Sequence, residues 1–376
     1  MTGTRRKLQA VEWKGKPVAN PRMIDVARRA NVAPSTVSYA LSGQRTISPS
    51  TRKRILRAIA ELGYKPNELA RGLASRRSRV VALLLPESQR GIGFTEMEFA
   101  TGAAQAAKEL GHQLVLSVTN SNTAGQVEAL NKGGLIAGAI LMEVRLDDER
   151  IPLLRNAGIP FSMIGRPRDP DGIDCADIDF DQTGRDAVEH LAKLGHRKIA
   201  FLNHSASEMS TAYGPSVRAA AALRRAAEEF SVAYLERPCG EDSESGEAAF
   251  RELLETAPDL TGIAIMNDRA TVGVLSAIER IGASVPRDFS VVSIASSTRV
   301  TEMFRPKLTT LEPQAIELGQ MGARLLIEAL QTPPDLEREP ASVLLPCRLV
   351  VRDSSGPPPA PPTPAPAPAP TSISNV

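Results

Sequence analysis

The chain has 376 residues, 42% of them hydrophobic, and its apolar runs are too short for a membrane-spanning helix, which needs about 18 apolar residues. Its three cysteines and four histidines are scattered without CxxC or HExxH spacing, which excludes a disulfide framework and a zinc site. The net charge of +2 hides a strong segregation, because residues 1–79 carry 18 Lys/Arg against 4 Asp/Glu, whereas residues 80–376 carry a net charge of −12.

Residues 24–42 are predicted to form two short helices joined by a tight turn. One apolar pair in each segment, at helical spacing, predicts one buried face per helix. The pairs are Ile24 with Ala27 and Val37 with Leu41. Two short helices joined in this way lay the second helix across the major groove of DNA, although a generic helical hairpin has the same pattern. The polar residues expected to face outward are Ser35, Thr36, Ser38 and Tyr39.

A third helix is predicted to begin after Ser48, which acts as its cap, with Pro49 in the first helical position. An apolar stripe of Ile55, Ile59 and Leu62 continues to Gly63, which is expected to end the helix in the left-handed conformation. A three-helix unit within a strongly basic segment is the pattern of a nucleic-acid-binding module, and a merely solvated surface does not explain such segregation.

Four phrases in this region resemble the head and hinge of the lactose-repressor (LacI/GalR) family of bacterial transcription regulators. They are DVA (25–27), TVS (36–38), ISPST (47–51) and GYKPNELARGLAS (63–75). The resemblance continues through LGHRKIAFL (194–202), NDRATVGVL (267–275), GASVPRDFSVVSI (282–294), PKLTTLEPQAIELGQMGARLLIEAL (306–330) and LVVRDS (349–354). It therefore covers nearly everything except the two tails.

The resemblance implies that the second helix reads the major groove and that the segment after Pro66 becomes a hinge helix in the minor groove. It assigns base contacts to Ser35, Thr36, Ser38 and Tyr39, phosphate contacts to Ser48 and Thr51, and the hinge to Asn67, Ala70, Leu73 and Ala74. Leu73 is expected to wedge between base steps and kink the duplex. Because so short a helix is marginal in water, it should fold only when DNA and a second copy supply contacts.

The chain also departs from the family pattern in its head. Tyr39 stands where many members have an arginine that contacts guanine, so base preference there is open. Ala33 and Arg22 replace the usual caps of the second and first helices, with residues 20–21 as an alternative cap for the first. Gly72 replaces a longer hinge residue and is expected to destabilise the hinge helix, because glycine has a low helix propensity.

The body alternates short apolar runs with amphipathic stretches, which is the βα alternation of doubly wound parallel sheets. Strands are expected at 80–85, 113–118, 137–141, 159–164, 198–202, 262–266 and 290–294, and helices at 95–110, 183–194, 216–230 and 269–281. The length exceeds one comfortable core, so two Rossmann-like subdomains with a ligand cleft between them are expected. The family resemblance implies that the chain crosses between these lobes near 178–181, 311–313 and 344–347.

The expected fold class is an all-α helix-turn-helix head with a hinge helix, followed by an α/β two-lobed, periplasmic-binding-protein-like body of two parallel-sheet subdomains. Its expected parts are a disordered basic tail (1–20), a DNA-binding domain (21–64), a hinge (65–79), an effector-binding and dimerisation domain (80–355) and a disordered Pro/Ala tail (356–376). Within the body, the N-lobe is expected at about 80–178 and 312–345, and the C-lobe at about 179–311 and 346–355.

Effector-binding residues are expected where strands end and helices begin. Asp268 follows a strand and can accept from two ligand hydroxyls, although it also suits a helix cap. Arg218 matches the family's cleft arginine and can grip hydroxyls, a carboxylate or a phosphate, although a surface position is an alternative. Asn267 is a weaker candidate, Phe94 a candidate apolar wall, and His196 is predicted to be structural.

Sugar binding has limited support from the sequence. Residues 293–296 read SIAS where the family usually has a glycine-phenylalanine-aspartate-aspartate phrase. Aromatic residues make up only 4% of the chain, and its single tryptophan, Trp13, lies in the N-terminal tail. A stacking wall for a sugar ring is therefore poorly supported.

Together these features predict a cytoplasmic, homodimeric, sequence-specific transcription regulator, most simply a repressor, that binds a palindromic double-stranded DNA operator. A small-molecule effector between the lobes is expected to modulate its DNA affinity. No cofactor, metal, membrane partner or enzymatic activity is expected, and the basic N-terminus has no apolar export segment. The alternative is a small-molecule (sugar-like) binding protein or an enzyme on the same two-lobe fold.

Overall fold

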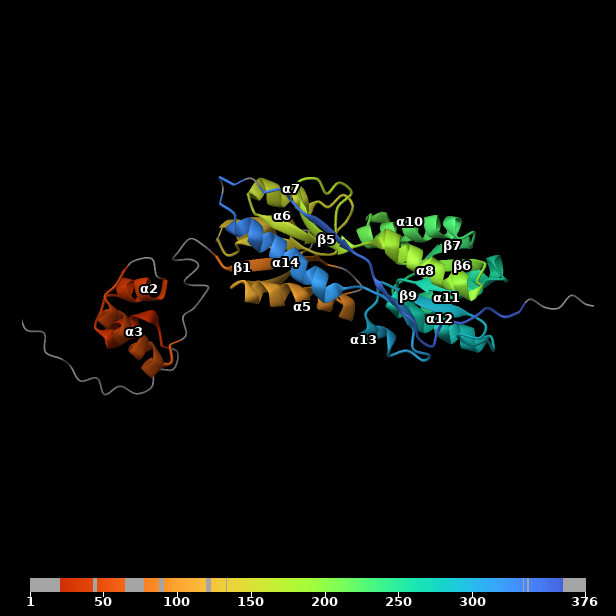
Figure 1. Cartoon of the computed structure of the whole chain (residues 1–376), viewed down its shortest axis with the longest axis horizontal. Coiled ribbons are helices and arrows are strands. Elements are labelled where there is room, and N and C mark those ends of the chain that lie inside the picture. The colour runs from red at the N-terminus through yellow and green to blue at the C-terminus, as the bar shows by residue number, and fades with distance from the viewer. Residues whose placement is uncertain are drawn as a thin grey trace, which may run out of the picture. The chain divides into compact units, whose positions relative to one another are not determined.

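The computed structural model describes residues 21–42, 46–64, 78–87, 91–119, 123–132, 134–333, 335–336 and 338–360. It contains two compact units, Met1–Arg76 and Arg77–Val376, which are described separately below (Figure 1). The predicted hinge residues Asn67, Ala70, Leu73 and Ala74 lie outside the described residues, as do the tails at 1–20 and 361–376.

The first unit is a bundle of three helices. They are α1 (Met23–Ala30), α2 (Pro34–Ser42) and α3 (Pro49–Leu62). Its core consists of small and branched side chains from all three helices together with the ring that follows α3: Val26, Ala27, Ala30, Val37, Ala40, Ile55, Ala58 and Tyr64. The predicted three-helix unit is confirmed, and its small core side chains allow the helices to pack closely.

The ends of these helices follow the predicted signals. Ser48 caps α3 and accepts a hydrogen bond from the Thr51 amide, and Gly63 ends that helix at φ 61°. Asn31 ends α1 in the left-handed region at φ 51°, in the predicted turn. The capping residue of α1 is Arg22, whose amide donates to the Asp25 carboxylate at 2.9 Å. Residue 20, part of the alternative cap, lies outside the described residues.

One predicted core residue of this unit is wrong. Ile24 is 51% exposed, whereas Ala27, its predicted partner on the buried face, is 2% exposed. The buried stripe of α1 is formed by Val26, Ala27 and Ala30, and at helical spacing this stripe leaves Ile24 at its margin. A spacing of three residues was not enough to fix the centre of the buried face.

The second unit contains two six-stranded sheets, one in each lobe (Figure 1). The N-lobe sheet has the order β11-β5-β4-β3-β1-β2, and the C-lobe sheet has the order β12-β10-β9-β8-β6-β7. All strand pairs are parallel except the pairing of β10 with β12. The N-lobe strands are β1 (Val80–Pro86), β2 (Gln113–Thr119), β3 (Gly138–Leu141), β4 (Phe161–Ile164), β5 (Asp174–Ile178) and β11 (Ser342–Leu345). The C-lobe strands are β6 (Lys198–Asn203), β7 (Ala233–Pro238), β8 (Gly262–Ile265), β9 (Ser290–Ile294), β10 (Thr309–Glu312) and β12 (Arg348–Val350).

Helices cover both faces of each sheet. In the N-lobe they are α5 (Phe94–Glu109), α6 (Thr123–Lys132), α7 (Arg150–Ala157) and α14 (Ala315–Gln331). In the C-lobe they are α8 (Phe180–Leu194), α9 (Ala206–Ser210), α10 (Gly214–Glu229), α11 (Ser243–Thr256), α12 (Asp268–Arg280) and α13 (Thr298–Thr301). Successive residues of the central strand β1 point to opposite faces of the N-lobe sheet. Leu83 packs against α5 and α14 on one face, and Leu84 packs in the hydrophobic cluster on the other face. This is the expected doubly wound α/β architecture.

The chain passes between the two sheets three times. It leaves the N-lobe sheet after β5, returns to the N-lobe at α14 after β10, and leaves again between β11 and β12. These passages lie close to the positions implied by the family resemblance. Three segments therefore connect the two lobes, which belong to one compact unit.

His196 has the structural role predicted for it. Its Nδ1 lies 2.8 Å from the Thr261 hydroxyl, and its Nε2 lies 2.9 Å from the Ser290 hydroxyl and 3.1 Å from the Gly356 carbonyl oxygen. The ring is buried, and burial lowers the pKa of His196. The histidine therefore ties the start of β6 to β9 and to the segment that follows β12.

Candidate functional site

The polar face of α2 is the first candidate site. Val37 and Ala40 are buried in the core of the first unit, so the opposite side of α2 faces outward. Ser35 is exposed, and the other three predicted reading residues, Thr36, Ser38 and Tyr39, are half-buried. The structure therefore places all four predicted residues outside the buried core, on a helix whose packing leaves its polar face accessible.

The start of α3 is a second candidate contact point in the same unit. The Ser48 hydroxyl donates to the Thr51 hydroxyl at 2.8 Å and lies 3.1 Å from the Ser50 hydroxyl. A helix N-terminus that carries hydroxyls attracts phosphate through its dipole and its unpaired amides. Exposed cations follow in the next turns at Arg52, Lys53, Arg54 and Arg57.

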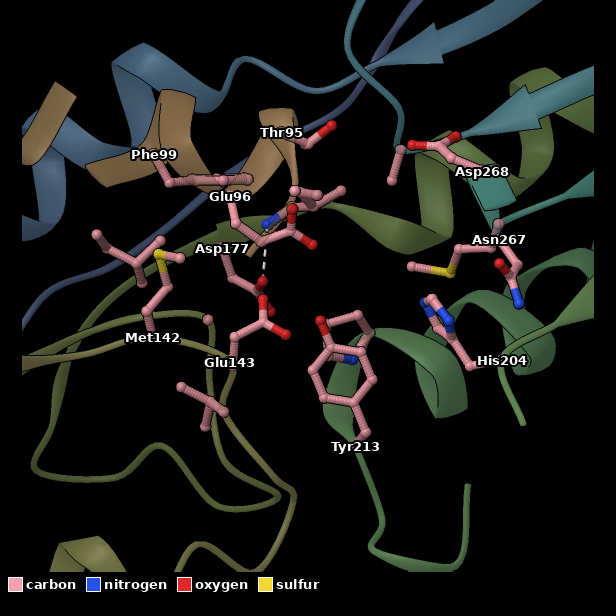
Figure 2. Close-up of a pocket in the computed structure, with 18 of the residues that line it drawn as sticks. Thr95, Glu96, Phe99, Met142, Glu143, Asp177, His204, Tyr213, Asn267 and Asp268 are labelled. Atoms are coloured by element: carbon pink, nitrogen blue, oxygen red, sulfur yellow. Dashed lines mark hydrogen bonds between the residues drawn. The ribbon is translucent and has the colours of Figure 1, made fainter. Parts of the chain in front are cut away.

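In the second unit a cleft is lined by residues from both lobes (Figure 2). Most of these residues follow the carboxyl ends of parallel strands or begin the next helix, which is where open α/β sheets bind ligands. The N-lobe contributes Thr95, Glu96, Phe99, Met142, Glu143 and Asp177, among others. The C-lobe contributes Phe180, His204, Tyr213, Glu241, Met266, Asn267, Asp268 and Arg269, among others.

Asp268, the first residue of α12, lines the cleft as predicted. Burial raises the pKa of Asp268 to about 6, and the negative charge of Glu96 adds to this rise. The nearby hydroxyls of Ser296 and Ser293 lower its pKa and partly offset the effect of burial. A hydrogen-bond donor that approaches Asp268 would favour its ionised form and lower this pKa.

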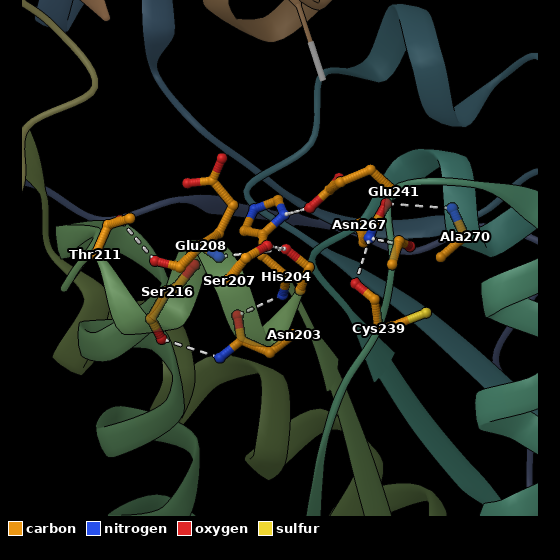
Figure 3. A network of polar contacts seen from close by, with 12 residues as sticks. Asn203, His204, Ser207, Glu208, Thr211, Ser216, Cys239, Glu241, Asn267 and Ala270 are labelled. Atoms are coloured by element: carbon orange, nitrogen blue, oxygen red, sulfur yellow. Dashed lines mark hydrogen bonds and ion pairs between the residues drawn. The ribbon is translucent and has the colours of Figure 1, made fainter. Parts of the chain in front are cut away.

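Asn267 also lines the cleft, but its polar atoms serve the fold (Figure 3). Its Oδ1 accepts from the Ala270 amide at 3.2 Å, and its Nδ2 donates to the carbonyl oxygens of Cys239 and Gly240 at 3.2 and 2.9 Å. Asn267 is therefore the cap of α12, and the alternative in which Asp268 is that cap is wrong. This leaves Asp268 available to a ligand.

Arg218 lies on α10 next to the cleft and outside its lining residues. It donates to the carbonyl oxygens of Arg166 and Pro167 at 2.6 and 2.9 Å, and its NH1 lies 3.6 Å from Asp177. With a side chain 14% exposed, it is not a surface arginine. Arg218 therefore contacts the cleft only indirectly, through Asp177, which is one of the lining residues.

Phe94 is not among the residues that line the cleft. It is the first residue of α5 and is 56% exposed, while its neighbours Gly93 and Thr95 reach the cleft. The aromatic rings that line the cleft include Phe99, Phe180 and Tyr213, which the sequence analysis did not identify. Aromatic surface is thus present in the cleft despite the low aromatic content of the chain.

Sequence reasoning also missed a polar cluster on the C-lobe side (Figure 3). The Nδ1 atom of His204 lies 3.0 Å from a carboxylate oxygen of Glu241, and the His204 ring meets the Tyr213 ring edge-on at 5.8 Å. His204 and Glu241 follow β6 and β7, respectively. The available signal was their position after adjacent parallel strands, but β7 itself was not predicted.

The described residues contain no group of three His, Cys, Asp or Glu side chains that suits a metal ion. In the same part of the chain, no helix is long and apolar enough to cross a membrane.

Two family models match the chain. The description "Bacterial regulatory proteins, lacI family" matches residues 22–67, and "Periplasmic binding protein-like domain" matches residues 188–355. The first match coincides with the three-helix unit, and the second covers most of the C-lobe and the later connections.

Curated relatives match over nearly their whole length. The HTH-type transcriptional regulator CelR of Thermobifida fusca is 33% identical over 350 residues, covering 89% of this chain and 98% of its own. Catabolite control protein A of Priestia megaterium is 29% identical over 342 residues, covering 89% of this chain and 99% of its own.

Solved structures show the same arrangement. A structure of the transcriptional regulator CelR in complex with cellobiose has a TM-score of 0.66 and 29% identity, covering 89% of this chain and all of that one. The Lac repressor dimer bound to operator and the anti-inducer ONPF has a TM-score of 0.75 and covers 90% of this chain and 99% of its own. At 23% identity, the latter shows the shared fold.

Proposed function

The chain belongs to the LacI family of bacterial regulatory proteins, and from this premise we propose that it is a cytoplasmic, homodimeric repressor of a palindromic operator. It is a DNA-binding transcriptional regulator, and a small molecule in the cleft sets its operator affinity. The observation that carries this function is the match to a regulator at 33% identity, over 89% of this chain and 98% of the relative. The named relatives are regulators, and none of them is an enzyme.

We propose that α2 reads base edges through Ser35, Thr36, Ser38 and Tyr39, and that Ser48 and Thr51 hold phosphates. Support comes from the accessible polar face of α2 and from the hydroxyl cluster at the start of α3. For the hinge residues Asn67, Ala70, Leu73 and Ala74, the proposal depends on the resemblance of the sequence to the family.

The body is proposed to bind the effector between an N-lobe (80–178 and 312–345) and a C-lobe (179–311 and 346–355). CelR has been solved with cellobiose, which supports a small polar effector for this family member too. Asp268 is proposed as a direct ligand. Arg218 is proposed to act by holding Asp177 in place, because its guanidinium contacts that carboxylate beneath the cleft wall.

The proposed mechanism couples the cleft to the head. An effector that binds the closed arrangement of the lobes better than the open one shifts their equilibrium, and the hinge segments of the two protomers respond. A difference of about 1–3 kcal/mol in effector affinity between the two states is sufficient for useful switching.

Two substitutions in the head test the proposed reading of DNA. Tyr39→Ala is expected to change base preference at one position in each half-site, because it removes a groove-facing side chain. Thr51→Ala is expected to weaken binding to all sequences alike, since phosphate contacts carry no base information. The measurement is a binding selection from random DNA, and a wild-type selection that yields no symmetric motif would overturn the proposal.

A further inference from the structure

Hydrogen bonds join the two lobes at two places beside the cleft, in addition to the three connecting segments. The first place lies between α5 of the N-lobe and the start of α13 in the C-lobe. The Ser297 amide donates to the Thr95 hydroxyl at 3.1 Å, and the Ser297 hydroxyl donates to the Glu98 carboxylate at 3.0 Å. The same carboxylate oxygen lies 3.4 Å from the Arg299 guanidinium. We call these contacts the side-chain clasp.

The second place lies between the loop after β3 in the N-lobe and the residues that begin α10 in the C-lobe. The Leu146 amide donates to the Ala212 carbonyl oxygen at 2.8 Å. The Gly214 amide donates to the Val144 carbonyl oxygen at 3.0 Å, which completes a short antiparallel bridge. A Cβ atom on Gly214 would lie 2.9 Å from that carbonyl oxygen and 2.6 Å from the Arg218 guanidinium, so glycine permits the approach. We call this bridge the backbone clasp.

The two clasps lie on opposite sides of the cleft. Thr95 of the side-chain clasp lines the cleft, as do Val144 of the backbone clasp and Tyr213 within its bridge. Figure 2 shows Thr95 on one side of the cleft and Tyr213 on the other. Because each clasp joins one lobe to the other, a rigid-body separation of the lobes breaks both.

Unfavourable backbone conformations are concentrated at the same two places. Among the described residues of the body, four non-glycine residues have left-handed backbone angles. Three of them lie in a clasp or within two residues of one, namely Glu143 at φ 56°, Ala212 at φ 55° and Ala295 at φ 54°. Such a conformation is unfavourable for a residue with a side chain and persists only where surrounding contacts enforce it. The clasps supply contacts of this kind, and their opening would release the strain.

The side-chain clasp is also connected to a segment that joins the lobes. The Thr298 amide, at the start of α13, donates to the Glu312 carboxylate at 3.1 Å. Glu312 is the last residue of β10, after which the chain returns to the N-lobe. A displacement of α13 would therefore also displace this connection.

We propose that the two clasps hold the lobes together in the protein without ligand, and that they open as one unit when the lobes separate. Only the regulatory consequence of this inference rests on the proposed function. Breaking either clasp shifts the equilibrium between the two lobe arrangements and thereby changes operator affinity.

Hydrogen–deuterium exchange of the full-length protein, without DNA or ligand, tests this coupling. Glu98→Ala weakens the side-chain clasp. Exchange at the Leu146 and Gly214 amides of the opposite clasp is then expected to become about fivefold faster or more, the lower end of typical coupling between sites. Glu109→Ala is the matched control, because it removes a carboxylate of the same helix whose partner, Arg324 of α14, lies in the same lobe. Unchanged exchange at Leu146 and Gly214 in Glu98→Ala, or equal acceleration in the control, overturns the inference.

Gly214→Ala tests the coupling in the reverse direction. The added Cβ atom displaces the Val144 carbonyl oxygen, and exchange at the Ser297 amide is expected to accelerate, while the central strands β1 and β8 keep slow exchange. Thermal unfolding checks that both variants are folded, and Glu98→Ala alone decides if Gly214→Ala does not fold. Acceleration confined to the backbone clasp overturns the inference.

Operator affinity of the same two variants, measured with a selected DNA site, separates this inference from the proposed function. Both variants are expected to change it in the same direction, and coupled exchange with unchanged operator affinity overturns the regulatory consequence. A protein with coupled clasps that selects no operator retains the clasps and loses the regulatory function. A protein that selects its operator but exchanges independently at the two clasps loses only the clasps.

Discussion

Asp268 is the residue whose ionisation most directly connects the cleft to pH. Its pKa of about 6 lies above the ordinary value of 3.8, so the side chain is increasingly protonated below pH 6. Hydrogen-bond donors of a ligand bind the ionised carboxylate more strongly than the protonated one. Effector affinity is therefore expected to fall as pH drops from 7.5 to 5, by up to about tenfold per pH unit below the pKa. Calorimetry at a series of pH values measures this.

The Asp268→Asn variant is the matched control for that pH dependence. It is expected to bind effector weakly at every pH and to retain the operator affinity of the free protein. A variant that keeps the full pH dependence would show that Asp268 is not the group responsible for it.

His196 predicts a second pH effect, on folding. Burial lowers its folded pKa below the ordinary value of 6.5, so the unfolded chain takes up the proton first. The contribution of neutral His196 to stability is complete above pH 6.5 and is lost as pH falls through and below that value. His196→Leu is expected to cost about 2–3 kcal/mol at pH 7.5, because it removes the hydrogen bonds of the buried ring to the hydroxyls of Thr261 and Ser290.

Urea unfolding at pH 7.5 and 5.5 measures both parts of this prediction. The His196→Leu variant should lose less stability between the two pH values than the wild type does. His112→Leu in the N-lobe is the control, since His112 is only half-buried and bonds locally to the Leu110 carbonyl oxygen. Equal acid sensitivity of wild type and His196→Leu would contradict the assignment.

At the level of single residues, the sequence predicted those cleft residues that directly follow an apolar strand and begin a helix. Asp268 and Asn267 were found because an apolar run ends directly before them. Glu143 and Glu241 were missed because the first follows a strand by two residues and the second follows a strand that is not apolar enough to detect. Arg218 was found by family resemblance, which gave its neighbourhood, whereas its contact with Asp177 needed coordinates.

At the level of elements, the helices α5 and α14 of the N-lobe pack with their backbones in close contact. A Cβ atom on Gly102 would lie 2.0 Å from the carbonyl oxygen of Ile316, so the two helices touch through a glycine. Gly102→Ala is expected to destabilise the protein by about 1–3 kcal/mol or more, because the backbone of α14 must move. Thermal unfolding measures the loss, which Ala104→Gln at an exposed site of α5 should not reproduce. An unchanged melting temperature in Gly102→Ala would show that this contact is not close in solution.

The helices and strands that were predicted correctly have strong local sequence signals, namely helix-capping residues and apolar runs. Ser48 with Pro49 and Gly63 fixed both ends of α3, and the seven apolar runs became strands. The missed strands are short or polar, such as β5 (Asp174–Ile178) and β7 (Ala233–Pro238), and they are strands because neighbours in the sheet pair with them. Local propensity alone cannot supply that information.

For the whole molecule, the segregated charge predicts a strong salt dependence of operator binding. Residues 1–79 carry a formal charge of +14, and each phosphate that they neutralise contributes a slope of about −0.9 in log affinity against log salt. Fluorescence anisotropy with labelled operator at several salt concentrations measures the slope. Arg251→Gln, an exposed change on α11, should leave it unchanged. A flat response would be incompatible with a head that binds phosphates.

The most direct test of the whole account is competition between a selected symmetric DNA site and random DNA for the full-length protein. A regulator of this family is expected to prefer its site by about 10³-fold or more at physiological salt, and an effector that occupies the cleft is expected to change that preference. Equal affinity for the symmetric site and for random competitor, with and without cleft ligands, would contradict it.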